Sequence, residues 1–302
     1  MRLRLDLAYD GSNFSGWSRQ PGLRTIEGVV DDALATLLRH PKPTVRLIVA
    51  GRTDAGVHAT GQVAHIDLSA LQWRLLSAAR RNATAEQSLA RRLNGLIAAT
   101  AADVVVGRVS VAAPGFDARF SPIWRRYEYR IADALSARDP RRRAHTLWRS
   151  GTLDAAAMDA AARSLTGLHD FAAFCKPRER ATTVRTLLEY EWMRDTEGVL
   201  VARVRADAFC HSMVRALVGA AVAVGLGRLE PERLTSILGD AVKANAFAVA
   251  VAKGLTLVEV GYPPDDELGA RAALTRARRE PLGRASDPSD WASMRGVAWS
   301  RN

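Results

Sequence analysis

The stretch 51-GRTDAGVHATGQVAH-65 places a single carboxylate, Asp54, in a glycine-flanked loop between an arginine and a histidine. Three roles are open to it: a turn residue, a metal ligand together with His58 and His65, or a nucleophile. The metal hypothesis is weak, because the spacing matches no established zinc pattern and no cysteine lies nearby. Aspartate before Ala-Gly is common turn chemistry, so this stretch taken alone favours a structural role.

Strand and helix patterns extend in both directions from this loop. Residues 61–69 alternate between two faces as a strand, and residues 3–9 do the same. Between them, Thr25 can cap a helix whose apolar residues recur with a 3.6-residue period. A helix over 84–97 and a strand over 103–112 complete this first part of the chain.

A similar order of elements begins again after Pro114. The patterns predict a strand over 125–133 with Tyr127 on its apolar face, a helix over 152–167 capped by Thr152, a hairpin of 184–192 with 199–209, helices over 211–225 and after Pro231, and a last strand over 255–262. This recurrence predicts an α+β protein of two related halves, 1–112 and 113–262, which share a sheet with a basic cleft between them. Residues 263–302 show little periodicity, and we interpret them as a mobile tail or an appended helix.

The cysteine content and the apolar runs indicate a cytoplasmic protein. Cys175 and Cys210 are too few for a disulfide framework and too isolated for a zinc site, which fits a reducing cytosol, although the two could also pair. No run reaches the ~18 apolar residues of a membrane span, and the N-terminus lacks the apolar region of a signal peptide.

The charge of the chain favours an anionic partner. The net charge is +11, and residues 123–150 hold eight arginines against three acids, with two tryptophans and two tyrosines among them. A second arginine cluster lies in 72–95. Arginine enrichment is also typical of GC-rich genomes, but basic clusters interleaved with aromatic rings suit phosphate contact and base stacking. Composition therefore favours nucleic-acid binding.

Two further segments bear on Asp54. Tyr127 lies in 116-FDARFSPIWRRYEYRI-131, and Arg215 lies in 206-ADAFCHSMVRALVG-219, one turn into an apolar helix. With 51–65 and the opening 9-YDGSNFSGWSRQPGLRTIEG-28, they resemble the tRNA pseudouridine synthase A family, in order, from about Arg4 to Tyr262. GRTDAGVHA is a highly specific signature of these synthases.

The resemblance assigns roles residue by residue. It implies that Asp54 is the catalytic aspartate and that Arg215 is the basic residue paired with it. Tyr127 matches the tyrosine that stacks on the target uracil and has been assigned a role in proton transfer at C5. Arg52 matches the arginine that helps to extrude the target nucleotide and occupies its place. His58 belongs to the same signature, and we group it with the substrate-binding residues as the holder of the loop.

The resemblance also implies the pseudouridine synthase fold, in which two related α/β halves share a mainly antiparallel central sheet. The implied activity is that of an isomerase (an intramolecular transferase) that converts uridine to pseudouridine at positions 38, 39 and 40 of the tRNA anticodon stem-loop. Nothing is oxidised and no group is added, so we expect no cofactor and no metal. The implied partners are tRNA and a second copy of the chain in a homodimer, with no membrane.

Other classes of function fit the sequence less well. A non-catalytic RNA-binding protein or tRNA chaperone on the same fold has no use for a nucleophile paired with arginine. A methyltransferase or nucleotide-dependent enzyme is disfavoured because neither G-x-G-x-x-G nor a P-loop is present. Cys210 beside His211 suggests a thiol nucleophile, but adjacent side chains point apart, which favours core packing. DNA binding lacks a helix-turn-helix or zinc module.

Overall fold

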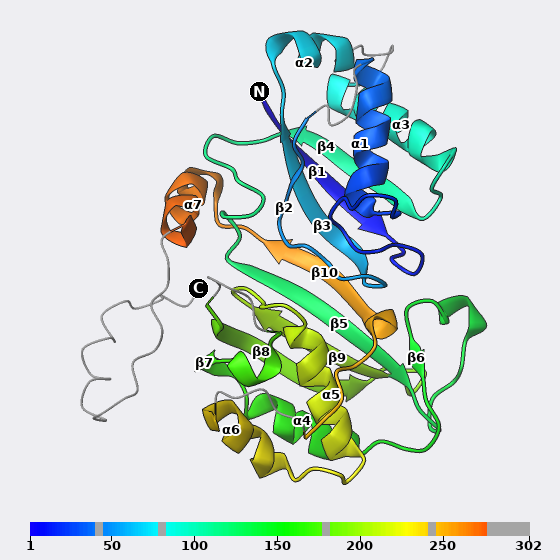
Figure 1. Ribbon diagram of the computed structural model, residues 1–302, viewed down its shortest axis with the longest axis vertical. Coiled ribbons are helices and arrows are strands. Elements are labelled where there is room, and N and C mark those ends of the chain that lie inside the picture. The colour runs from blue at the N-terminus through cyan, green and yellow to red at the C-terminus, as the bar shows by residue number, and fades with distance from the viewer. Residues whose placement is uncertain (40–44, 78–82, 177–181, 241–245, 277–302) are drawn as a thin grey trace.

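The computed structural model describes residues 1–39, 45–77, 83–176, 182–240 and 246–276 (Figure 1). Within these residues, ten strands form one sheet in the order β4-β1-β3-β10-β5-β9-β8-β7, with β2 beside β3 and β6 beside β5. The strands are β1 (Arg2–Tyr9), β2 (Ile48–Val49), β3 (His58–Asp67), β4 (Val104–Val111), β5 (Trp124–Ala132), β6 (Leu147–Trp148), β7 (Gly167–Asp170), β8 (Val184–Arg194), β9 (Leu200–Ala206) and β10 (Leu255–Gly261). The α-helices are α1 (Ile26–Leu38), α2 (Ala70–Leu76), α3 (Ala85–Ala98), α4 (Ala155–Arg163), α5 (Met213–Gly225), α6 (Pro231–Asp240) and α7 (Leu268–Arg276), and the 3₁₀ helices are η1 (Pro140–Arg142), η2 (Ala172–Phe174), η3 (Ala252–Gly254) and η4 (Asp265–Glu267).

The pairing confirms the expected α+β fold with a mainly antiparallel central sheet. Strands β1, β3 and β4 pair antiparallel in the first half, as do β5, β9, β8 and β7 in the second. Strand β10 runs parallel to β3, and β6 runs parallel to β5. Helices α1 and α3 pack with the first group of strands, and α4 to α6 lie against the second (Figure 1).

Strand β10 joins the two groups of strands and thereby positions the site. It lies between β3 and β5, where Leu257 pairs with Ala59 on one side and with Tyr127 on the other (Figure 1). Gly61 permits the close approach of β10 to β3, because a Cβ atom at this position would lie 2.1 Å from the Val258 carbonyl oxygen. The loop before β3 is therefore brought alongside Tyr127, although the two are far apart in the sequence.

One of the two predicted helix caps is confirmed, and the other is wrong. Thr25 caps α1 by accepting a hydrogen bond from the backbone N–H of Gly28, as expected. Helix α4 is capped by Asp154, whose side chain accepts from Ala157, and the expectation of Thr152 as its cap was wrong. Both residue types are good caps, and the backbone turn into the helix comes two residues later than the pattern indicated.

The first part of the C-terminal segment 263–302 forms an appended helix. Helix α7 packs on the loop between the two halves, where Ser121 donates a hydrogen bond to the carbonyl oxygen of Leu268 at 3.1 Å. Arg276 forms an ion pair with Asp117 at 2.7 Å from the end of the same helix. The remaining residues of the segment, 277–302, lie outside the described residues.

The two cysteines pair, which was the open alternative. Cys175 and Cys210 form a disulfide with their Cα atoms 5.8 Å apart. The bond ties the segment after η2 to the loop that leads into α5. Among the described helices, none is both long and apolar enough to span a membrane.

Candidate active site

Asp54 opens a tight turn in the loop between β2 and β3. The backbone N–H of Val57 donates to the carbonyl oxygen of Asp54 at 3.2 Å, and Gly56 has a φ of +78° at the third position. A turn with positive φ at this position favours glycine. The turn hypothesis is therefore right for the backbone, and it leaves the Asp54 side chain 33% exposed.

A buried hydrogen-bond network holds the loop that carries Asp54. The hydroxyls of Tyr9 and Thr53 share a hydrogen bond of 2.8 Å, and Gln62 donates to Tyr9 at 3.1 Å and to the Gly51 carbonyl oxygen at 2.9 Å. Burial raises the pKa of Tyr9 to about 12, so the phenol stays neutral. The residues on either side of Arg52 are thus held rigidly, which fixes the backbone that carries Asp54.

Two side chains of the second half face the Asp54 carboxylate. Arg215 Nη1 lies 3.6 Å from Oδ2, and His211 Nε2 lies 3.6 Å from Oδ1. These are ion-pair distances longer than hydrogen bonds. Arg215 is itself tied down, because its Nε donates to the carbonyl oxygen of Ala250 at 2.7 Å and its own carbonyl oxygen accepts from the Ala250 N–H at 3.0 Å. The structure thus brings Asp54 and Arg215 together; the contact with His211 was missed in the sequence.

Tyr127 lies on the buried face of β5, near enough to Asp54 for the charge of the carboxylate to act on its phenol. Its ring is 8% exposed and meets the ring of Phe209 edge-on, with centroids 5.2 Å apart. Burial raises the pKa of the Tyr127 phenol well above its ordinary value, and the nearby charge of Asp54 raises it further. The phenol is therefore neutral at physiological pH, and the ring is largely buried in this structure.

Arg125, two residues before Tyr127, connects the loops of the two halves. Its guanidinium donates to the carbonyl oxygens of Ala50 at 2.8 Å, Asp207 at 2.8 Å and Arg119 at 3.0 Å. Ala50 directly precedes the Asp54 loop, and Asp207 precedes the loop that carries His211. Sequence reasoning missed this residue, although the paired arginines before Tyr127 were a signal that could have found it.

Replacing Arg125 with Met is expected to lower the free energy of unfolding by about 3 kcal/mol, because bonds from a charged donor contribute roughly 1.5–3 kcal/mol each and water can replace only part of them. The matched control is Arg126→Met. Arg126 forms a half-exposed ion pair with Glu259, which contributes at most about 1 kcal/mol. Urea unfolding of both variants measures the difference, and equal losses would show that Arg125 does not connect the loops.

The other two expected substrate-binding residues lie in different surroundings. Arg52 is exposed beside Asp54, and it forms no ion pair with any described residue. His58 is 4% exposed; its Nδ1 accepts from the Gly11 N–H at 3.1 Å, and its Nε2 lies 3.1 Å from the Lys253 carbonyl oxygen, to which it donates. Burial lowers the pKa of His58, which favours this neutral ring. His58 thus holds the start of β3, whereas Arg52 faces solvent.

The three side chains of the metal hypothesis have separate structural partners. His65 accepts from the Ala118 N–H at 3.0 Å through Nδ1, and burial lowers its pKa to about 4. His58 is bonded as described above, and Asp54 faces Arg215. In the part of the chain that the structure describes, no three His, Cys, Asp or Glu residues are grouped as metal ligands.

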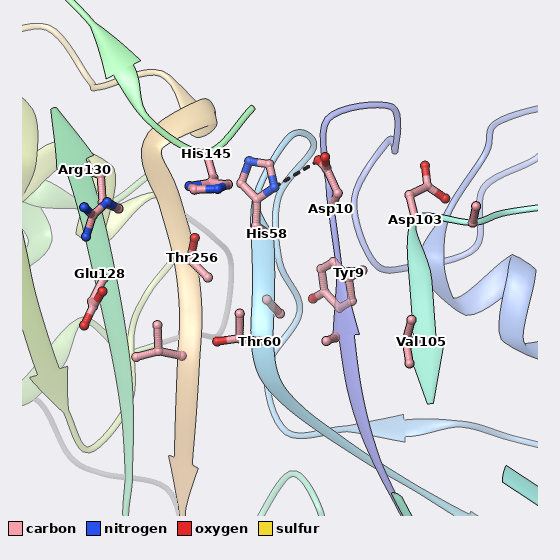
Figure 2. Close-up of a pocket in the computed structure, with 14 residues that line it drawn as sticks. Tyr9, Asp10, His58, Thr60, Asp103, Val105, Glu128, Arg130, His145 and Thr256 are labelled. Atoms are coloured by element: carbon pink, nitrogen blue, oxygen red, sulfur yellow. Dashed lines mark ion pairs between the residues drawn. The ribbon is translucent and has the colours of Figure 1, made fainter. Parts of the chain in front are cut away.

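A separate hollow of about 530 Å³ lies over β1, β3, β10 and β5 (Figure 2). His58 and Asp10 meet at its rim with 3.1 Å between Nδ1 and Oδ1 (Figure 2). Glu128 and Arg130 line it from β5, where they alternate with Tyr127 and therefore point to the other face of the sheet. Asp54 is not among the lining residues, so the hollow is distinct from the Asp54 site.

Comparison with known proteins first defines the class. The sequence profile of a family described as tRNA pseudouridine synthase matches residues 161–263. This match indicates the class of pseudouridine synthases, which are isomerases, and the relatives that follow show it over most of the chain.

Full-length relatives then define the family. The chain is 55% identical over 281 residues to the tRNA pseudouridine synthase A of Leifsonia xyli, a match that covers 92% of this chain and 97% of that one. It is 56% identical over 281 residues to the tRNA pseudouridine synthase A of Frankia casuarinae, covering 93% and 96%, and 49% identical over 280 residues to that of Streptomyces avermitilis, covering 92% and 94%. The chain belongs to the tRNA pseudouridine synthase A family.

Proposed function

We propose that this protein isomerises uridine to pseudouridine at positions 38, 39 and 40 of the tRNA anticodon stem-loop, with Asp54 as the nucleophile. One observation carries the proposal: the Asp54 carboxylate lies in the family's loop, opposite Arg215 and beside Tyr127. The names of the relatives support tRNA as the substrate and pseudouridylation as the reaction. The three positions and the role of Asp54 rest on the resemblance of the motifs.

The reaction needs a nucleophile and a way to move protons. The N1–C1′ bond breaks, the base turns over, and a C5–C1′ bond forms; C5 loses a proton, and N1 gains one. The overall change is an isomerisation, so no electrons are exchanged with another molecule. A carboxylate can stabilise or trap the separated base and sugar if it stays ionised in a site that RNA closes from water.

The residues around Asp54 suit this task. Arg215 stabilises the ionised carboxylate when RNA covers the site, because an isolated carboxylate would become protonated there. Tyr127 offers an aromatic ring against which a flipped uracil can stack, and a base must leave the stem to react. Arg52 is exposed beside Asp54. From the family resemblance, we expect it to fill the space that the flipped nucleotide leaves in the stem.

Binding of the tRNA rests on charge and shape. The net charge of +11 and the arginines of 123–150 suit contacts to phosphates, through which RNA helices are recognised largely by shape. We propose from the family resemblance that the protein acts in the cytoplasm as a homodimer whose two subunits share one tRNA.

Release of tritium from labelled tRNA tests this function. Wild-type protein with tRNA that carries 5-³H-uridine is expected to release tritium, because the C5 hydrogen must leave when the C5–C1′ bond forms. Replacing the uridines at positions 38, 39 and 40 with cytidine is expected to stop the release from the same tRNA. Undiminished release from that transcript would refute the positions but not the reaction, and tight binding with no release from either would leave an RNA-binding protein without activity.

A further inference from the structure

The second contact of the Asp54 carboxylate has no assigned role. His211 Nε2 lies 3.6 Å from Oδ1, while Arg215 Nη1 lies 3.6 Å from Oδ2. Each oxygen therefore faces its own nitrogen atom. A carboxylate turns readily about the bond that joins it to Cβ, and partners on both oxygens define the plane in which it is held.

The backbone of His211 is anchored on both sides. Its carbonyl oxygen accepts from the N–H of Lys176 at 2.9 Å, and the preceding Cys210 is bonded to Cys175. The following residue, Ser212, has a φ of +64°, a left-handed conformation that turns the chain into α5. Such a conformation is uncommon outside glycine and persists where the surrounding structure imposes it. The loop thus holds the Cα of His211 in place at the mouth of the site.

The imidazole ring of His211, by contrast, is not anchored to the backbone of the described residues. The side chain is 41% exposed, and among the described residues its ring has no polar partner other than Asp54. Arg215 differs, because its Nε is already bonded to Ala250. The two buried histidines differ, because His58 accepts from the Gly11 N–H and His65 from the Ala118 N–H.

We propose that His211 is a positioning residue for the reaction: its Nε2–H attracts Oδ1 of Asp54, while Arg215 attracts Oδ2, so that the carboxylate is presented to the nucleoside in one orientation. This inference rests on the proposed function, since it gives His211 its task through Asp54. A small misplacement of a reacting group can slow a reaction by about a hundredfold. We expect this role to affect the rate of the chemical step and not the affinity for tRNA.

The test compares His211→Ala, which removes the donor, with His211→Gln, whose amide N–H has a reach similar to that of Nε2. His169→Ala serves as the matched control, because this histidine of β7 is also partly exposed but contacts the carbonyl oxygen of Thr166. Single-turnover tritium release from 5-³H-uridine tRNA measures the chemical step, and filter binding measures the Kd for tRNA. The exposed position of His211 makes unfolding of the variants unexpected, and circular dichroism checks their fold.

We expect His211→Ala to slow tritium release about 10- to 100-fold with a Kd for tRNA within about twofold of wild type, and His211→Gln to recover most of the loss. A wild-type rate in His211→Ala would overturn the inference, because His211 would then be a surface residue without a role in the reaction. A weaker Kd with an unchanged rate at saturating tRNA would make His211 an RNA contact, and equal losses in both variants would show that the N–H donor is not what matters. Failure of the proposed function would show itself separately, as absence of tritium release by the wild type.

Discussion

Asp54→Asn is expected to abolish tritium release from 5-³H-uridine tRNA while tRNA binding is retained. The amide has the shape of the carboxylate but is a very poor nucleophile, and loss of a catalytic nucleophile typically lowers kcat by roughly 10⁴- to 10⁶-fold. The Kd for tRNA is expected to stay the same or to improve slightly, because one negative charge is removed next to the phosphates. Single-turnover tritium release and filter binding provide the two measurements.

The structure makes this variant a clean test. Asp54 is partly exposed, and its two ionic contacts are each 3.6 Å long, so the substitution should change the free energy of unfolding by less than about 1 kcal/mol. Thermal unfolding of Asp54→Asn provides the control. If the folded variant kept more than about a hundredth of the wild-type rate, a role as nucleophile would be untenable, since that residue would be dispensable to the chemistry.

Arg215→Met is the second large effect that we expect, with kcat lowered about 10²- to 10³-fold. The substitution removes the fixed positive charge opposite Oδ2 of Asp54 and keeps a side chain of similar length. Charges held in place at a reacting centre commonly contribute this much to the rate. The measurement is the single-turnover rate at saturating tRNA.

Arg215→Lys separates the charge from the geometry. Lysine keeps the positive charge but cannot hold the Ala250 carbonyl oxygen and face Asp54 at the same time, as the Arg215 guanidinium does. Its rate is expected to lie between those of wild type and Arg215→Met. A wild-type rate for Arg215→Met would reduce this contact to a surface ion pair of little energetic value.

Local sequence patterns predicted the elements around the site well. Thr25 and the apolar period after it indicated α1, and the alternation around Tyr127 placed that residue on the buried face of β5. The motifs around Asp54 and Arg215 were sufficient to indicate the family. These inferences succeed because caps, periodicity and short motifs depend on residues that are near one another in the chain.

The mistaken cap of α4 shows the limit of such patterns. Thr152 and Asp154 both have side chains that can accept from a helix N-terminus, and composition does not distinguish between them. Only the backbone path into the helix, which depends on what the helix packs against, selects Asp154.

The sequence by itself determined the family to which the chain belongs and most of the longer strands and helices, but not the short elements α2, β6 and β7. The tertiary structure alone decided that β10 enters between β3 and β5, that Cys175 pairs with Cys210, that Arg125 bonds to the loops of both halves, and that His211 faces Asp54. Each of these contacts joins residues well separated in the sequence, or depends on a backbone turn such as that at Ser212. Such contacts arise from the packing of whole elements against one another, and local patterns carry no information about which distant partner an element will meet.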